Sequence, residues 1–225
     1  MCFSATASFT ASAVLTVAGV VTLKQARRPQ QFPLALIPMI FALQQSVEGW
    51  IWFMQTQPMP AWLEAALSHI FPFIAYTFWS IWVPYAVRKI EIDPLRCKIL
   101  SALQAIGILV GGFFLYFMLS GPLQVKIINH SIHYAFEFPL YALSQWLYGI
   151  AIIGATLVSS HKLVNLFGIG LIISYNIARF YFTPTYPSVF CFFSALISVI
   201  IYLQLRLENH FQWQQWSDLR TSESR

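Results

Sequence analysis

The sequence predicts an all-α protein: a polytopic membrane bundle of seven transmembrane helices, with the N-terminus outside and the C-terminus in the cytoplasm. Composition is the first observation behind this prediction. Of the 225 residues, 58% are hydrophobic and only 9% are charged, whereas a soluble domain carries about 25% charged residues. The second is the recurrence of apolar runs of about 20 residues, the length that spans a bilayer. The third is the placement of the cations, which cluster between those runs.

Seven apolar runs reach the length required of a membrane-spanning helix. The predicted spans are 4–23, 32–54, 61–87, 99–119, 139–159, 163–182 and 188–207. They make up one transmembrane domain, residues 1–207, followed by a cytoplasmic amphipathic tail, residues 208–225. The aromatic residues of this tail suit an interfacial anchor or a partner-binding segment. Pro38, Pro72 and Pro84 lie within spans and are expected to kink or loosen them.

The cations predict the orientation. Those that follow the first, third, fifth and seventh spans are Lys24, Arg27, Arg28, Arg88, Lys89, Arg96, Lys98, Lys162, Arg206, Arg220 and Arg225. Only Lys126 and Arg179 remain for the other side, so the positive-inside rule makes the first group cytoplasmic. Because clusters of this kind set membrane topology, the net charge of +5 does not indicate a nucleic-acid partner.

Polar side chains within the spans gather toward the predicted outer ends. An ionisable group inside a bilayer costs about 2.5–3.5 kcal/mol on insertion scales, so each one needs a reason. Glu48, Arg179 and Cys191 lie near the outer ends of their spans, and Cys2 stands where the first span begins. The inner half of the bundle is expected to be nearly pure hydrocarbon.

Helical spacing places several of these side chains on common faces. Gln44 and Glu48 are four positions apart and share a face of the second span. Ser4 begins a stripe of serines and alanines that suits close packing between helices. If "HSIHYAFE" is helical up to Pro139, one side of that helix carries the residues His130, His133, Tyr134 and Glu137.

Together these groups predict an outward-facing polar pocket. The candidate catalytic residues are Cys2, Glu48 and His133. The candidate ligands for zinc or another transition metal are Cys2, Glu48, His133 and Cys191, because thiolate, imidazole and carboxylate groups bind such metals. The candidate ligand-binding residues are Ser4, Gln44, Gln45, Trp52, Tyr134 and Arg179.

Structural alternatives stay open for most of these residues. An ion pair between Glu48 and Arg179 would join the second and sixth spans without further function. Independently of that pair, the structural alternative for Cys191 is a small buried hydrophobe. Removal of the initiator Met would leave Cys2 with a free α-amine beside its thiol, a pair that can bind a metal or act as a nucleophile. A disulfide between Cys2 and Cys191 is the other option in an oxidising compartment.

Four stretches of the chain also resemble a known family. The opening "MCFSATASF", the span-2 motif "QQSVEGWIW", the segment "HSIHY" and the late "VFCFFSAL" are similar to those of a family of uncharacterised bacterial multi-pass membrane proteins. The resemblance covers nearly the whole chain and implies about seven helices in the bacterial inner membrane, with no known activity. The residues to which the resemblance points are Cys2, Ser4, Gln44, Gln45, Glu48, Gly49, Trp52, His133, Tyr134 and Cys191.

Three hypotheses of function follow. In the first, the pocket binds a metal ion or acts on a small or lipid-borne substrate, as a membrane-embedded enzyme would. In the second, it binds or transports a small solute or lipid. In the third, the polar layer only holds the helices together in a structural subunit of a membrane complex. An inner half without polar residues favours a one-sided pocket over a channel.

Overall fold

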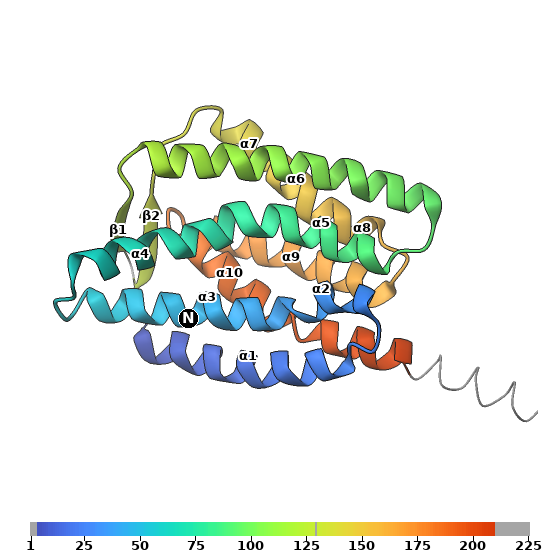
Figure 1. Cartoon of the computed structure of the whole chain (residues 1–225). Helices are drawn as coiled ribbons and strands as arrows, with labels where there is room; N and C mark the ends of the chain where they lie inside the picture. Colours follow the sequence, from blue (N-terminus) through green and yellow to red (C-terminus); the bar gives the residue numbers. More distant parts are fainter. Residues whose placement is uncertain (1–3, 129, 210–225) are drawn as a thin grey trace, which may run out of the picture.

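The computed structural model describes residues 4–128 and 130–209, which form a bundle of long helices with one β-hairpin at one end (Figure 1). About 80% of the structure is helical. Seven rods are long and apolar enough to cross a membrane: Ala5–Gln25, Pro29–Met54, Ala61–Ile90, Pro94–Ser120, Tyr141–Val158, Lys162–Tyr181 and Tyr186–Asn209. The predicted helical class and number of spans are confirmed, since each predicted span overlaps one rod. The orientation across the membrane stays a prediction.

Some rods are single helices and others are built from consecutive segments. In chain order the elements are α1 (Ala5–Gln25), η1 (Pro29–Gln31), α2 (Phe32–Ala35), α3 (Ile37–Met54), α4 (Ala61–Pro72), η2 (Phe73–Phe78), α5 (Trp79–Ile90), α6 (Pro94–Ser120), β1 (Gln124–Ile128), β2 (Ser131–Ala135), α7 (Tyr141–Gly149), η3 (Ile150–Gly154), α8 (Ala155–Val158), α9 (Lys162–Tyr181) and α10 (Tyr186–Ile197). After two turn residues, 198 and 199, the last rod continues as a helix to residue 209.

Two of the three span prolines coincide with interruptions. Pro38 occupies the first turn of α3, directly after the break that ends α2. Pro72 ends α4, and the chain then continues as the π-helical segment η2. A proline lacks the amide hydrogen needed for the helical hydrogen-bond pattern, which explains both positions. Pro84 lies inside α5, which runs on without a break.

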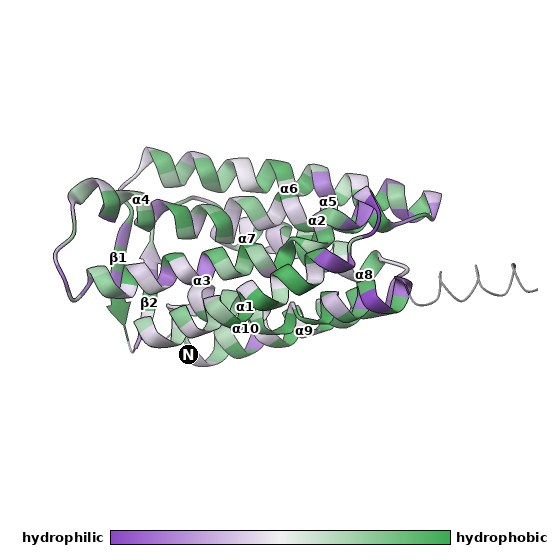
Figure 2. Ribbon diagram, turned by 60° about the horizontal axis from the view of Figure 1, so that its bottom comes forward, coloured by the Kyte–Doolittle hydropathy of each residue, from purple (hydrophilic) through white to green (hydrophobic). Residues whose placement is uncertain are grey.

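The rods alternate in direction, so the bundle has two distinct ends (Figure 1). The hairpin end contains β1, β2, the start of α1 and the end of α3. The basic end contains the turns after α1, α5 and α8 together with the end of the last rod, and the described cations assigned above to the cytoplasm gather there. In Figure 2 hydrophilic residues are concentrated at the two ends, and α3 also carries hydrophilic bands between them.

Small residues let η2 and α5 approach α6 closely. Gly107 and Gly111 lie one turn apart on α6, and both are buried. Their carbonyl oxygens accept hydrogen bonds from Ser80 and Thr77, at 3.0 and 3.1 Å. A Cβ added at Gly107 would overlap the backbone carbonyl of Ser80. This Gly-x-x-x-Gly contact is typical of helices packed within membranes, and the sequence-based expectations did not include it.

The stripe of serines and alanines on α1 is a packing face, as its small side chains predict. Ser8 is fully buried, and the Ser12 hydroxyl donates a 2.8 Å hydrogen bond to the Ala42 carbonyl of α3. Gly19 lies against the backbone of Met39. Small side chains therefore bring α1 and α3 together along much of their length.

Buried polar contacts connect the turns at the basic end. Of the residues that make them, only Gln204 lies inside a predicted span, 188–207, so the expectation of a nearly pure hydrocarbon inner half stays a prediction. The buried Glu91 carboxylate accepts hydrogen bonds from the Ser160 amide (2.7 Å) and hydroxyl (2.9 Å). The Gln204 amide lies 3.0 Å from the His161 imidazole. Asn209 donates to the Gln25 carbonyl at 2.7 Å. These contacts join the turns after α5 and α8 to the last rod, and turn residues need such partners wherever they are buried.

The electrostatic effect on Glu91 follows from these contacts. Burial raises its pKa, but hydrogen bonds from the Ser160 amide and hydroxyl and from the amides of Asp93 and Ile92 lower it further than burial raises it. Its net pKa therefore lies below the ordinary value, because the donors stabilise the charged carboxylate. Glu91 accordingly stays ionised at neutral pH and keeps these turns connected.

The segment "HSIHYAFE" is not a helix, which corrects the conditional prediction above. Ser131–Ala135 forms β2, which pairs with β1 in an antiparallel hairpin in which Lys126 faces His133. Ile132, Tyr134 and Phe136 alternate along this segment and are all buried in the core at the hairpin end. Alternation with a period of two is the strand signal. The hairpin closes this end of the bundle and lies over its apolar core.

Candidate functional site

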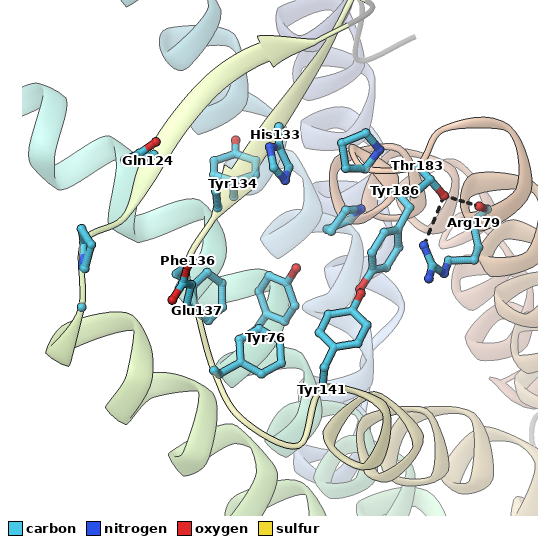
Figure 3. Close-up of a pocket in the computed structure, with 16 residues that line it drawn as sticks. Tyr76, Gln124, His133, Tyr134, Phe136, Glu137, Tyr141, Arg179, Thr183 and Tyr186 are labelled. Atoms are coloured by element: carbon cyan, nitrogen blue, oxygen red, sulfur yellow. Dashed lines mark hydrogen bonds between the residues drawn. The ribbon is translucent and has the colours of Figure 1, made fainter.

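A pocket of about 530 Å³ lies beneath the hairpin (Figure 3). Its walls come from η2, β2, α7, the end of α9 and the start of α10. The polar and aromatic side chains among its lining residues are Tyr76, Gln124, His133, Tyr134, Phe136, Glu137, Phe138, Tyr141, Arg179, Thr183 and Tyr186. Because the elements are far apart in sequence, only the folded bundle assembles this pocket.

Arg179 supplies positive charge to the pocket. It is exposed, at the end of α9, and its guanidinium donates a 3.2 Å hydrogen bond to the neutral hydroxyl of Thr183. The guanidinium carbon also lies 5.3 Å from the centre of the Tyr186 ring. Within residues 4–128 and 130–209, the one ion pair joins Arg28 to Glu208 at the basic end. No carboxylate of these ranges therefore forms an ion pair with Arg179.

Three tyrosines place their hydroxyl groups in the same pocket. The hydroxyls of Tyr141 and Tyr186 are 3.0 Å apart and share a hydrogen bond. Tyr76 reaches toward them from η2 (Figure 3), close enough for its hydroxyl to interact with both. A phenol group donates or accepts hydrogen bonds as its partner requires. The three residues, called the tyrosine cluster below, therefore offer donors next to the cation of Arg179.

His133 and Glu137 complete the polar lining. The His133 side chain is half-buried, and burial, followed by the nearby positive charge of Lys126, lowers the pKa of its imidazole below the ordinary value of 6.5. His133 is therefore mostly neutral at pH 7. Glu137 is exposed and follows two residues after β2. His133 and Arg179, both among the predicted site residues, line this same pocket.

A second pocket, the lateral groove, continues from the first along the side of the bundle. It has a volume of about 740 Å³ and is mostly apolar in lining. Residues of α7 and η3 form one wall, and residues of α9 and α10 form the other. The two pockets share the lining residues Tyr76, Tyr141, Arg179, Tyr186 and Pro187. They are therefore neighbouring compartments that meet at Arg179 and the tyrosine cluster.

Glu48 belongs to a different, buried cluster. Its side chain is fully enclosed and accepts a hydrogen bond from the Ser188 hydroxyl of α10. One turn earlier on α3, Gln44 accepts a 2.9 Å hydrogen bond from the Trp79 indole. Cys191 lies beside both, within electrostatic range of Glu48. The expected bridge from Glu48 to Arg179 is not formed, so this alternative is wrong: Glu48 joins α3 to α10 instead.

The other predicted site residues have separate places, except Tyr134, which also lines the pocket beneath the hairpin. Ser4 caps α1 by accepting a 3.2 Å hydrogen bond from the Ala7 amide. Gln45 and Trp52 are buried on α3, and the Tyr134 ring stacks on Phe71 at a centroid distance of 4.4 Å. Neither Gln45 nor Trp52 is among the residues lining the two pockets.

The cysteines and the proposed metal set separate as well. Cys191 is a buried free thiol at the inner wall of the lateral groove. Cys2 lies outside the described residues. Within the part of the chain that the structure describes, no group of three or more His, Cys, Asp or Glu side chains could hold a metal ion. Glu48, His133 and Cys191 therefore do not form a shared ligand set, and the described geometry gives the metal hypothesis no support.

The fold and the site define a class: a multi-pass membrane protein with a polar pocket at one end of the bundle and an apolar groove beside it. Within that class the chain belongs to a family of unknown function (DUF6629), which it matches over residues 1–216. This confirms the expected membership of an uncharacterised family. The curated proteins and the solved structures gave no significant match.

Proposed function

We propose that this protein binds a small molecule carrying an anionic group, such as a phosphate or a carboxylate, in the pocket beneath the hairpin. The observation that carries the proposal is Arg179, a cation that lines this pocket with a neutral hydroxyl as its hydrogen-bond partner. A guanidinium has five N–H donors in a fixed fork, which matches both kinds of anion. Its contact with Thr183 leaves donors for a ligand.

The surroundings of Arg179 support this function. The pocket volume of about 530 Å³ falls within the ordinary range for small-molecule sites, roughly 300–1,000 Å³. Hydroxyl groups of the tyrosine cluster lie beside the cation and can donate to further oxygens of the ligand. Walls contributed by Phe136 and Phe138 lower the local dielectric constant, which strengthens charge interactions.

The membrane location makes the proposal more specific. Seven spans support a multi-pass protein, and the cation distribution supports a bacterial inner-membrane orientation with the hairpin end outside the cytoplasm. In that orientation the pocket faces the outer side of the membrane, as expected for the outward-facing site. The ligand would then reach it from outside the cell or from the outer leaflet.

Substitution of Arg179 tests the proposal. The full chain, purified in detergent, should bind inorganic phosphate, and Arg179→Gln should weaken this binding at least tenfold, or about 1.4 kcal/mol, because the substitution removes the cation. Arg206→Gln is the matched control: Arg206 also lies over a tyrosine, 6.0 Å from the Tyr202 ring, but at the basic end. Titration calorimetry measures both. Equal binding by the wild type and Arg179→Gln would exclude the proposed role of Arg179.

His133 predicts a pH dependence of binding. Its lowered pKa means that the imidazole gains its charge only below pH 6.5. Sulfate is the suitable probe, because its own charge is constant in this range. We expect sulfate affinity to rise as the pH falls below 6.5, since a second cation then joins Arg179 in the pocket beside Glu137. His133→Gln should remove most of this rise, while the Arg179-dependent binding persists.

The lowered pKa of His133 also affects the stability of the ligand-free protein. A falling pH should strengthen sulfate binding but lower this stability. Because the folded state binds the His133 proton less readily than the unfolded state, thermal stability should decrease as the pH falls from 6.5 toward the lowered pKa, and then level off. His133→Gln should flatten this part of a melting-temperature series in detergent. A series that is equally steep in wild type and variant would show that His133 does not cause it.

A further inference from the structure

The two adjoining pockets, together called the path below, share five lining residues and have complementary chemistry. At the hairpin end the path begins with Arg179, His133 and Glu137. Beyond the shared tyrosine cluster it continues into the lateral groove, whose lining includes Trp146, Ile153, Ile172 and Phe190. A ligand that fills both compartments therefore needs a polar, anionic end and an apolar body.

Both long walls of the groove change from polar to apolar in the same direction. Along α7 the groove-lining residues Tyr141, Gln145 and Gly149 follow each other at intervals of four, which places them on one face. Along α9 the corresponding order from the hairpin end is Arg179, Asn176 and Ile172. The Gln145 amide nitrogen is buried and has no hydrogen-bond partner among the described residues. It offers a donor at the middle of the path.

The groove opens sideways, toward the surface that faces the lipid. Trp146 and Ile150 line it, and both are exposed at the outside of the bundle, to 73% and 46%. Both lie within the span Tyr141–Val158, so this exposure is to acyl chains when the helices cross a membrane. A molecule already in the bilayer can enter here without passing through water.

From these observations we infer that the ligand is a membrane lipid with an anionic head group, and this inference rests on the proposed function. The head group occupies the pocket beneath the hairpin and contacts Arg179, while one chain lies in the lateral groove between α7 and α9. A lipid chain in the bilayer is already in an apolar solvent, so its transfer into the groove gains little hydrophobic free energy. The groove mainly positions the chain. Selection among lipids therefore depends on the head group.

Gly149 provides a way to block the chain compartment alone. It lines the groove, and a Cβ added there meets no atom within 4 Å. Gly149→Leu is therefore expected to fill part of the groove, since its Cβ has open space, and leucine is a better helix former than glycine. Gly112→Leu is the matched control, since Gly112 also has open space around its Cβ but lines neither pocket.

The test uses the full chain in phosphatidylcholine nanodiscs and two probes. Dioleoyl phosphatidic acid, detected by native mass spectrometry of the released complex, carries the phosphate and the chains; inorganic phosphate carries the charge alone. We expect Gly149→Leu to reduce phosphatidic acid binding at least tenfold and to change phosphate binding less than twofold. Gly112→Leu should match the wild type with both probes, and Arg179→Gln should lose both.

The outcomes separate the two proposals. Two outcomes overturn the lipid inference while Arg179-dependent phosphate binding keeps the proposed function. In the first, phosphatidic acid binds no better than phosphatidylcholine. In the second, Gly149→Leu binds phosphatidic acid as the wild type does. If neither probe depends on Arg179, the proposed function is overturned together with the inference. Melting temperatures of both leucine variants, equal to that of the wild type, show that the fold is intact.

Discussion

Replacing Gly107 by alanine is expected to destabilise the bundle severely. The added Cβ would overlap the Ser80 carbonyl across the contact between α5 and α6. That carbonyl is backbone, so relief requires the two helices to separate. Separation would weaken the hydrogen bonds that Ser80 and Thr77 donate to α6. Overpacking alone costs about 1–3 kcal/mol, and the lost contacts add to it.

The measurement is thermal unfolding in detergent, with a control on the same helix. Gly112→Ala adds the same methyl group where nothing lies within 4 Å. It should leave the melting temperature unchanged or raise it slightly, because alanine favours the helix. Similar melting temperatures for the two variants would show that the Gly107 contact is looser than the structure indicates.

Replacing Ser188 by alanine is the second large effect that we expect. Ser188 donates a hydrogen bond to the enclosed Glu48 side chain, and both residues are fully buried between α3 and α10. Removing a donor from a buried acidic group leaves part of its desolvation uncompensated. Leaving a buried acceptor without its donor costs about 1–3 kcal/mol. Ser188→Ala should lower the stability by an amount of this order and leave phosphate binding intact.

Ser194→Ala is the control for this prediction. Ser194 is equally buried on α10, but its hydroxyl donates within the helix, to the Phe190 carbonyl at 2.7 Å. Its replacement should change the melting temperature little. If Ser188→Ala instead abolishes phosphate binding while the protein stays folded, Glu48 belongs to the binding site and its assignment to a structural cluster is wrong.

The seven spans could be predicted from the sequence because the bilayer imposes a length and an apolar composition on each of them. Predicted and observed spans overlap throughout, and the breaks near Pro38 and Pro72 follow from the missing amide hydrogen. The hairpin was missed because its sequence carries only a short and ambiguous signal. A histidine pair three residues apart fits a helix as well as a turn and strand, and the alternation of Ile132, Tyr134 and Phe136 that decides the matter is short.

The site was only partly predictable. Arg179 and His133 stand out in the sequence because charged and titratable groups near a bilayer need a reason. The tyrosine cluster does not stand out, since Tyr76, Tyr141 and Tyr186 are compatible with spans and interfaces anywhere. Only the fold brings their hydroxyls together. Glu48 was assigned to the same pocket because the sequence shows how deep along a span a residue lies. It does not show toward which neighbouring helix the side chain points.

The hydrogen bonds at the basic end fix one end of several helices relative to each other. Glu91, Ser160, His161 and Gln204 tie the turns beside α5, α8 and α9 to the last rod. Long helices fixed at one end behave as levers, so small rotations about this fixed end become larger displacements at the other. The base of α9 is held in this way, while its far end carries Arg179. The basic end therefore fixes the base of α9, and Arg179 and the groove wall beside it lie at the end of α9 that these bonds do not hold.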